Sequence, residues 1–114
     1  MQTIQQERAK YALEQVQAVA RSSEFLSYAS AMPAMIVMNG LGQTAAFYKS
    51  KGDAHSQLYN LLSNWLCQPN QPYAGKDLLV GITQCNMQSY LLAQAEALAL
   101  LDWVKKFAKA YMKE

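Results

Sequence analysis

The last part of the chain, from about Met87 to Lys113, constrains the fold most, because its apolar residues recur at steps of three and four. This spacing places them on one face of a helix, where other helices must cover them. The predicted face comprises Leu91, Ala97, Leu98, Leu101, Val104, Ala108 and Tyr111. Because Gln94, Glu96 and Asp102 interrupt the apolar run, we expect a helix packed in a bundle and not a helix that spans a membrane.

The composition favours an all-α fold for the whole chain of 114 residues. Apolar residues make up 52% and charged residues 16%, which is enough to build a core and unlike a disordered chain. The length suits one domain and is short for two. Ala, Leu, Gln, Glu, Lys and Met, which lose little side-chain freedom in a helix, dominate over strand formers. We therefore expect a single domain over residues 1–114, a compact bundle of about five to six helices.

Capping signals place a first helix at the start of the chain. Thr3 is followed three residues later by Gln6, and such a pair forms a capping box at a helix N-terminus. Apolar residues continue from there at steps of three and four, so we expect this helix to end near Arg21. Ser22 or Ser23 can then cap the next helical segment.

Pro33 is expected to break that next segment, because a proline inside a helix removes an N–H donor and clashes with the preceding turn. Ser30 should cap a new helix, in whose first turn Pro33 is tolerated. We predict that this second helix runs from about Ala31 to Ser50 and that Gly52 marks its end.

The second half of the chain has two further capping signals and one loop. Asp53 is expected to cap a third helix, whose apolar residues repeat at helical spacing. Residues 67–77 contain two prolines together with Asn70 and Gly75, and we predict a loop with an exposed tip there. Asp77 should cap a short helix that precedes the last long one.

Gly40, Gly42 and Ala45 match the G-x-G-x-x-A pattern of dinucleotide-binding folds. Such a site needs a strand before the glycines, a parallel strand after them and an acidic residue about twenty positions further on. The corresponding position falls in residues 63–65, which contain no acid, and the segment that follows the glycines is predicted to be helical. We therefore interpret both glycines as points where a neighbouring helix approaches closely, with a turn at Asn39-Gly40 as the alternative.

Clusters typical of catalytic or metal sites are missing from the sequence. His55 is the one histidine, and Cys67 and Cys85, the two cysteines, form no CxxC pair. We interpret His55 as a solvated polar residue without a catalytic partner. The eight carboxylates are scattered, with no pair at helical spacing on an apolar face. We therefore expect no enzymatic activity, no metal site and no cofactor.

The N-terminal sequence MQTIQQERAK is polar, whereas a signal peptide would carry an apolar core. We therefore expect a cytoplasmic protein without a membrane partner. A reducing compartment favours free thiols, so Cys67 and Cys85 are interpreted as packing residues, with a disulfide between them as the alternative.

The basic residues are informative through their distribution, since a net charge of +2 does not indicate a nucleic-acid partner by itself. Lys105, Lys106 and Lys109 share one side of the predicted last helix. Taken alone, such a group is better explained as a solvated C-terminal turn that complements the helix dipole. Together with basic residues of the first two helices, the group could instead form a stripe that follows phosphates. The candidate nucleic-acid-binding residues are Lys49, Lys51, Lys105, Lys106, Lys109, Arg8 and Arg21.

Three segments in order carry a family resemblance: QQERAKYALEQV, LSYASAMPAMIVMNGLGQTAAFYKSKG and EALALLDWVKKFAKA. The matching positions are Arg8-Ala9, Pro33 through Gln43, Trp65-Leu66, and Glu96 through Ala108. In these segments the chain resembles the small subunit of the Cmr complex, the RNA-guided effector of type III-B CRISPR antiviral defence. The resemblance covers most of the chain except the loop after Leu66, and it also implies an all-helical fold.

The resemblance implies a non-catalytic subunit of a ribonucleoprotein. In that family, copies of the small subunit stack into a minor filament beside a backbone subunit that carries the RNA-cleaving residue, and the groove between them holds guide and target RNA. The implied partners are the backbone and large Cmr subunits, further copies of this chain, and guide and target RNA. One alternative stays open, a protein-protein scaffold or adaptor without RNA contact. A small helical enzyme or ligand binder is disfavoured, because the sequence lacks a catalytic cluster.

Overall fold

The computed structural model describes residues 1–19 and 22–112, and within these residues the chain forms five helices and no strand. The helices are α1 (Ile4–Ala18), α2 (Ser23–Lys51), α3 (Asp53–Leu66), α4 (Leu78–Gln84) and α5 (Met87–Met112). The predicted all-α fold is therefore confirmed. The predicted ends of the first helix near Arg21 and of the last helix at Lys113 lie outside the described residues.

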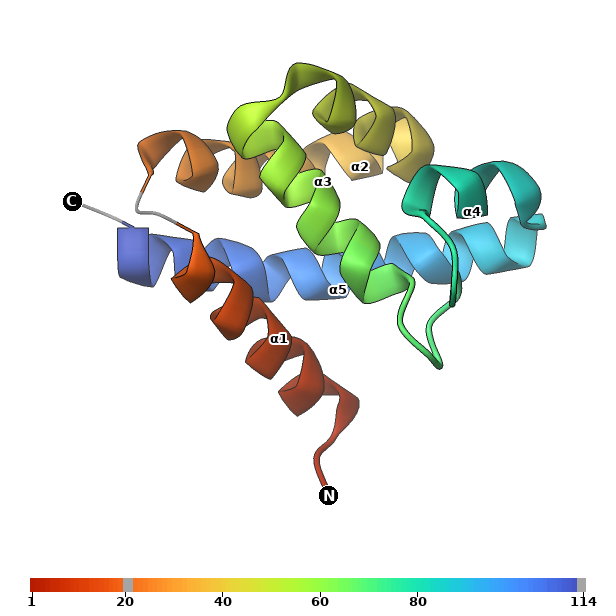
Figure 1. Cartoon of the computed structure of the whole chain (residues 1–114), viewed down its shortest axis with the longest axis horizontal. Helices are drawn as coiled ribbons and strands as arrows, with labels where there is room; N and C mark the ends of the chain where they lie inside the picture. The colour runs from red at the N-terminus through yellow and green to blue at the C-terminus, as the bar shows by residue number, and fades with distance from the viewer. Residues whose placement is uncertain (20–21, 113–114) are drawn as a thin grey trace.

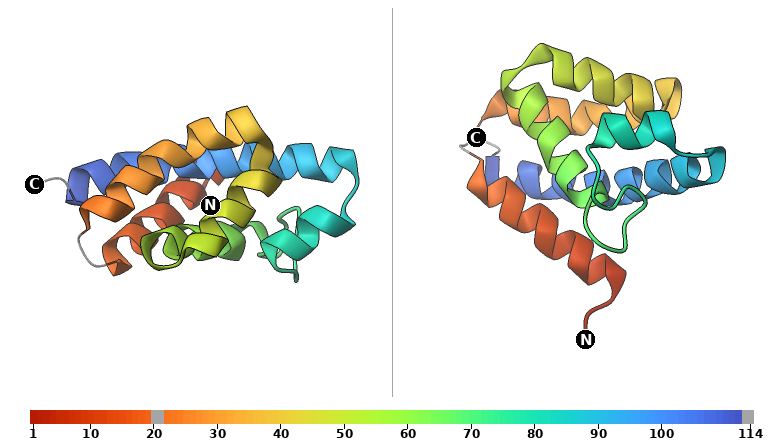
Figure 2. Two further views of the ribbon diagram at one scale, coloured as in Figure 1. Left: turned by 90° about the horizontal axis from the view of Figure 1, so that it is seen from above. Right: turned by 45° about the vertical axis from the view of Figure 1, so that its right-hand side comes forward.

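The helices are arranged around the long, central α5 (Figure 1). The first limb of α2, residues 23–39, runs antiparallel to α5 and lies beside it, whereas α3 and α4 lie in front of this pair (Figures 1 and 2). α1 crosses the C-terminal half of α5 diagonally. One continuous core draws buried residues from every helix, and its largest fully buried members include Tyr48, Tyr73, Phe25, Met32, Ile36, Leu58, Leu62, Leu66, Leu100 and Leu101.

The capping signals of the first two helices are confirmed. The Thr3 hydroxyl accepts a hydrogen bond from the Gln6 amide at 3.1 Å, and the Gln6 side chain accepts one from the Thr3 amide at 2.9 Å. The Ser22 hydroxyl accepts from the Phe25 amide at 3.1 Å and so caps α2. These interactions are local in sequence, which is why the pattern of residues alone reveals them.

The predicted break at Pro33 is wrong, and so is the predicted start of the second helix at Ala31. Pro33 lies inside α2, which begins at Ser23 and leaves Ser30 in mid-helix with no capping role. Met32 and Ile36, on either side of Pro33, are completely buried. Their packing offsets the roughly 3 kcal/mol that an internal proline costs a helix.

The actual interruption of α2 is at Gly40, where the backbone adopts φ 87° and ψ 159°. This corresponds to the alternative of a turn at Asn39-Gly40. The turn redirects the second limb of α2, residues 41–51, from the plane of α5 toward the front of the molecule (Figure 2). Because this region of backbone space is essentially restricted to glycine, Gly40 determines where α2 bends.

α5 supplies partners for the amide groups that the turn exposes. The Leu41 amide donates to the Gln94 side-chain oxygen at 2.9 Å, and the Gly42 amide donates to the Tyr90 hydroxyl at 3.0 Å. A Cβ on Gly42 would lie 3.3 Å from the Ile82 side chain, so the predicted close approach at this glycine is confirmed. The second limb therefore starts like a helix whose N-terminus is capped by another helix.

Neither aspartate acts as the predicted side-chain cap. At α3 the N-cap residue is Gly52, and Asp53 is already the first helical residue. Asp77 does occupy the N-cap position of α4, but its carboxylate accepts hydrogen bonds from the Tyr59 and Ser63 hydroxyls at 2.8 and 3.3 Å. These two hydroxyls in turn accept from the first amides of α4, so Asp77 caps its helix through two residues of α3.

The loop between α3 and α4 is confirmed, but it is not simply an exposed tip. Tyr73 in this loop is buried, and its hydroxyl lies 3.5 Å from the Cys85 sulfur. A Cβ on Gly81 would come within 2.5 Å of the Tyr73 ring, so a larger residue at 81 would displace it. The loop therefore contributes an aromatic anchor that holds α4 against α3.

The predicted apolar face of the last helix is correct in its centre and wrong at its ends. Leu101 is fully buried, whereas Leu91 and Tyr111 are exposed. The positions that are buried in α5 are Ala93, Ala97, Leu100, Leu101, Val104, Ala108 and Met112. The buried face changes along α5 because α2 and α1 pack against different stretches of this long helix.

Leu101→Ala is expected to lower the free energy of unfolding by about 2 to 5 kcal/mol, because it leaves a cavity in the centre of the core. Chemical denaturation followed by circular dichroism measures this change. Leu92→Ala is the matched control, since Leu92 is an exposed leucine of the same helix, and it should change stability by less than about 0.5 kcal/mol. Equal effects of the two substitutions would contradict the assigned inner face of α5.

Gly40→Ala is expected to destabilise the protein by more than Gly52→Ala. Both glycines have a positive φ and an extended ψ, which costs an alanine roughly 1 to 3 kcal/mol. A Cβ at position 40 would also lie 2.9 Å from the Tyr90 hydroxyl, whereas at position 52 nothing lies within 4 Å. Comparing the free energies of unfolding of the two variants isolates the contact with Tyr90, and a larger loss at position 52 would contradict its importance.

Candidate nucleic-acid interface

The C-terminal half of α5 presents the clearest group of basic side chains. Lys106 and Lys109 are exposed, and Lys105 beside them is half-buried. The Lys106 ammonium lies 3.1 Å from the Asp102 carboxylate, with the two side chains 66% and 62% exposed. Such an exposed ion pair contributes little stability and exchanges readily, so it leaves Lys106 able to contact another anion. We call Lys105, Lys106 and Lys109 the α5 lysines.

Lys49 and Lys51, at the end of α2, are held over aromatic rings. The Lys49 ammonium lies 5.1 Å from the centre of the Tyr59 ring, and that of Lys51 lies 5.1 Å from the centre of the Phe47 ring. Burial tends to raise the pKa of Asp77, but hydrogen bonds from Tyr59 and Ser63 together with the charge of Lys49 outweigh it, so this pKa is lowered. Lys49 thus already has a structural role near the start of α4.

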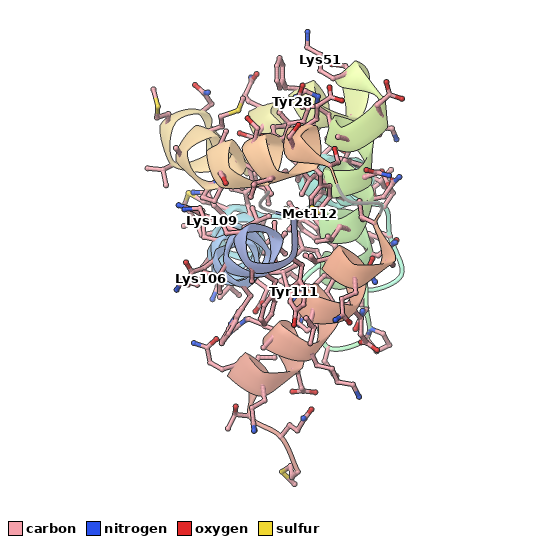
Figure 3. All side chains as sticks on the ribbon, turned by 90° about the vertical axis from the view of Figure 1, so that its left-hand side faces the viewer. Tyr28, Lys51, Lys106, Lys109, Tyr111 and Met112 are labelled. Atoms are coloured by element: carbon pink, nitrogen blue, oxygen red, sulfur yellow. The ribbon has the colours of Figure 1, made fainter. Side chains whose placement is uncertain are left out.

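The structure separates the basic residues into two groups. Figure 3 shows Lys51 at the top of the molecule and Lys106 and Lys109 together at the side, on α5, with the first limb of α2 between them. The α5 lysines therefore form one compact cluster, and the lysines at the end of α2 form another. These lysines thus form two separate groups and not one continuous stripe.

Arg8 lies apart from both groups, in an ion pair inside the fold. Its guanidinium donates to both oxygens of Glu96, at 2.6 and 2.8 Å, and the two side chains are only 16% and 13% exposed. The Trp65 indole N–H donates to the same carboxylate at 2.9 Å. Glu96 thus joins α1, α3 and α5. The sequence contains no local pattern that predicts this ion pair, because 88 positions separate Arg8 from Glu96.

The environment of Glu96 favours its ionised form. Burial on its own would raise the pKa of this carboxyl, but the hydrogen bonds from Arg8 and Trp65 and the charge of Arg8 lower it below the ordinary value of 4.5. Two of the five N–H donors of Arg8 are thereby used within the protein. Arg21, the other candidate arginine, lies outside the described residues.

His55, Cys67 and Cys85 are the side chains that could take part in catalysis or bind a metal, and each contacts other residues of the fold. His55 is half-buried and stacks on Tyr28 with ring centres 3.6 Å apart, so its interpretation as a solvated residue is wrong. Cys67 and Cys85 are free thiols, as expected. In residues 1–19 and 22–112, no group of three or more metal-binding side chains comes together. None of the helices in the same residues is long and apolar enough to cross a membrane.

Comparisons with known proteins agree with the resemblance seen in the sequence. A family model described as CRISPR-associated protein (Cas_Cmr5) matches residues 4–111. The CRISPR system Cmr subunit Cmr5 of Thermus thermophilus is 30% identical over 118 aligned positions that cover all of both chains. The crystal structure of a Cmr5 family protein from the same organism has a TM-score of 0.83 and 28% identity, and the match covers 98% of this chain and all of the other.

Replacing the ionisable partner of Arg8 should change how stability depends on pH. The pKa of Glu96 is lowered in the folded state, so its contribution is complete above about pH 4.5 and is lost as the pH falls through the folded pKa. Glu96→Gln is expected to cost about 1 to 3 kcal/mol at pH 7, and the difference from the wild type should shrink below pH 4.5. Denaturation curves from pH 3 to 8 test this.

Asp102→Asn is the control for that experiment, because the ion pair of Asp102 with Lys106 is exposed. It should change stability by less than about 0.5 kcal/mol across the same range. A constant effect of Glu96→Gln at every pH would show that the charge of Glu96 is not what stabilises the contact between α1 and α5.

Proposed function

Because this chain belongs to the Cmr5 family of CRISPR-associated proteins, we propose that it is a non-catalytic structural subunit of a type III-B Cmr effector. In this role it stacks with further copies in the minor filament, beside the backbone and large subunits, and lines the groove that holds guide-paired target RNA. The family assignment supports the assembly. The RNA contact is inferred from the charges of the surface.

The α5 lysines are the single observation that carries the proposed RNA contact. Lys106 and Lys109 are exposed, lie together on one side of α5, and have at most a weak ion pair with Asp102. Flexible ammonium groups of this kind neutralise phosphates without reading bases. The subunit therefore strengthens the binding of any target, while base pairing with the guide selects the sequence.

The other candidate residues have weaker support for a direct contact with RNA. Lys49 and Lys51 lie over aromatic rings, and Arg8 donates both of its charged hydrogen bonds to Glu96. We place Lys49 and Lys51 at the margin of the proposed surface, because both side chains are exposed but lie over aromatic rings. Arg8 acts in this proposal mainly by holding α1 in place.

A scaffold without RNA contact is the second candidate function. It is favoured by the ion pair that holds Arg8 inside the fold and by the contact of the exposed Lys49 with the Tyr59 ring. A non-catalytic role fits both candidates, because His55, Cys67 and Cys85 lie in packing environments and not beside an activating base. Salt dependence separates the two candidates, because only phosphate contacts release counterions.

The combined change Lys106→Ala and Lys109→Ala is expected to weaken target binding about equally for all RNA sequences. Each lost phosphate contact should reduce the slope of log affinity against log salt by about 0.7, so the double variant should lose about 1.4 per copy. The measurement is target-RNA binding by Cmr complexes reconstituted with either form of this subunit, over a series of salt concentrations.

The combined change Lys10→Ala and Lys76→Ala is the matched control, because both lysines are exposed and belong to other elements, α1 and the loop before α4. It removes the same charge and should leave the slope unchanged. If the Lys106 and Lys109 variant assembles fully and keeps the wild-type slope, the scaffold function replaces the RNA contact.

A further inference from the structure

Asp102 is the one exposed acidic residue of α5, and it lies on the same side of the helix as the α5 lysines. Lys105 and Lys106 follow it by three and four positions and Lys109 by seven, a spacing that brings side chains together on a helix surface. The other acidic residue of α5, Glu96, is only 13% exposed and is bound by Arg8. A negative charge therefore adjoins the cluster to which the proposed function assigns phosphates.

The fold gives Asp102 no other partner. Its carboxylate accepts a hydrogen bond from Lys106 at 3.1 Å, and among the described residues no second donor approaches it. Asp102 lies in the middle of α5, away from the first turn, where an acidic side chain would interact favourably with the helix dipole. An exposed ion pair at this spacing adds little to stability. The contact is therefore better explained by its effect on Lys106 than by its effect on the fold.

The Asp102 carboxylate and an RNA phosphate compete for the same ammonium group. Both are anionic acceptors for the N–H donors of Lys106. A phosphate can bind this ammonium fully only when Asp102 releases it, and the carboxylate left behind then repels the phosphate. The two side chains are 66% and 62% exposed, so water screens the pair and RNA can displace Asp102.

We propose that Asp102 weakens the binding of RNA by the α5 lysines, because it acts as an internal competitor of the phosphates. The α5 lysines attract RNA of any sequence, including RNA that does not pair with the guide. Asp102 opposes this attraction and leaves base pairing with the guide unchanged. Because several copies of the subunit lie along one RNA in the proposed assembly, the weakening multiplies from copy to copy. This inference rests on the proposed function, which assigns the phosphates to the α5 lysines.

Asp102→Asn tests the competition, because it removes the charge and keeps the size of the side chain. Reconstituted Cmr complexes with this variant should bind RNA at least about twofold more tightly at about 50 mM salt, and up to about fivefold for each copy that touches the RNA. The factor should be the same for complementary and non-complementary RNA. It should disappear near about 1 M salt, where charges are screened beyond about 3 Å. An unchanged affinity at low salt overturns the proposal.

Glu7→Gln is the matched control, because Glu7 is an exposed acidic residue in the first turn of α1. The start of α1 points away from α5 (Figure 1), and among the described residues Glu7 has no ion pair. This variant removes the same charge and should bind RNA within about 1.5-fold of the wild type. A gain equal to that of Asp102→Asn would assign the effect to the net charge of the subunit and overturn the competition.

The same substitution in a Lys106→Ala background shows whether Asp102 acts through Lys106. Without the contested ammonium, Asp102→Asn should raise RNA affinity by less than half as much, on a logarithmic scale, as it does in the wild type. A general repulsion between Asp102 and RNA would instead give the same gain in both backgrounds. An undiminished gain therefore overturns the proposal.

The lysine variant described above separates this inference from the proposed function. If Lys106→Ala with Lys109→Ala lowers the salt slope while Asp102→Asn leaves the affinity unchanged, the lysines bind RNA and only the competition is overturned. If the lysine variant assembles fully and keeps the wild-type slope, the RNA contact is overturned, and the competition with it.

Discussion

Two hydrogen bonds from α2 to α5 hold the turn at Gly40, and the positions of the later elements depend on that turn. The positive φ of Gly40 leaves the amides of Leu41 and Gly42 without partners in α2, and Gln94 and Tyr90 of α5 accept their hydrogen bonds. Buried amides without partners would cost several kcal/mol, so the turn and α5 require each other. The second limb of α2 then places Tyr48 in the core, where its hydroxyl donates to the Tyr28 carbonyl at 2.7 Å.

Burial distinguishes the cations that stabilise the fold from those that can bind another molecule. Arg8 is mostly buried and bidentate to Glu96, and with Trp65 it connects three helices. Removing one partner of such a pair leaves a charge in a partly desolvated place, which is costly. Lys106 has an ion pair as well, but water screens it, so its ammonium can exchange partners at little cost.

The basic surface of α5 contains its own competing charge. The α5 lysines attract any polyanion, whereas Asp102 opposes that attraction from the same side of the helix. In a complex whose guide selects the target by base pairing, phosphate contacts that do not read bases add affinity without adding selectivity. The fold leaves both kinds of charge in water, so the balance between them depends on ionic strength.

The sequence by itself determined the helical class, the caps at Thr3 and Ser22 and the loop after Leu66, because these depend on neighbours within a few residues. It also indicated the family, through motifs that span most of the chain. Tertiary structure decided where α2 bends, since burial of Met32 and Ile36 makes Pro33 tolerable while contacts from α5 hold Gly40. It likewise decided which cations are exposed, because the pairing of Arg8 with Glu96 depends on how distant helices pack and leaves no periodic signal in the sequence.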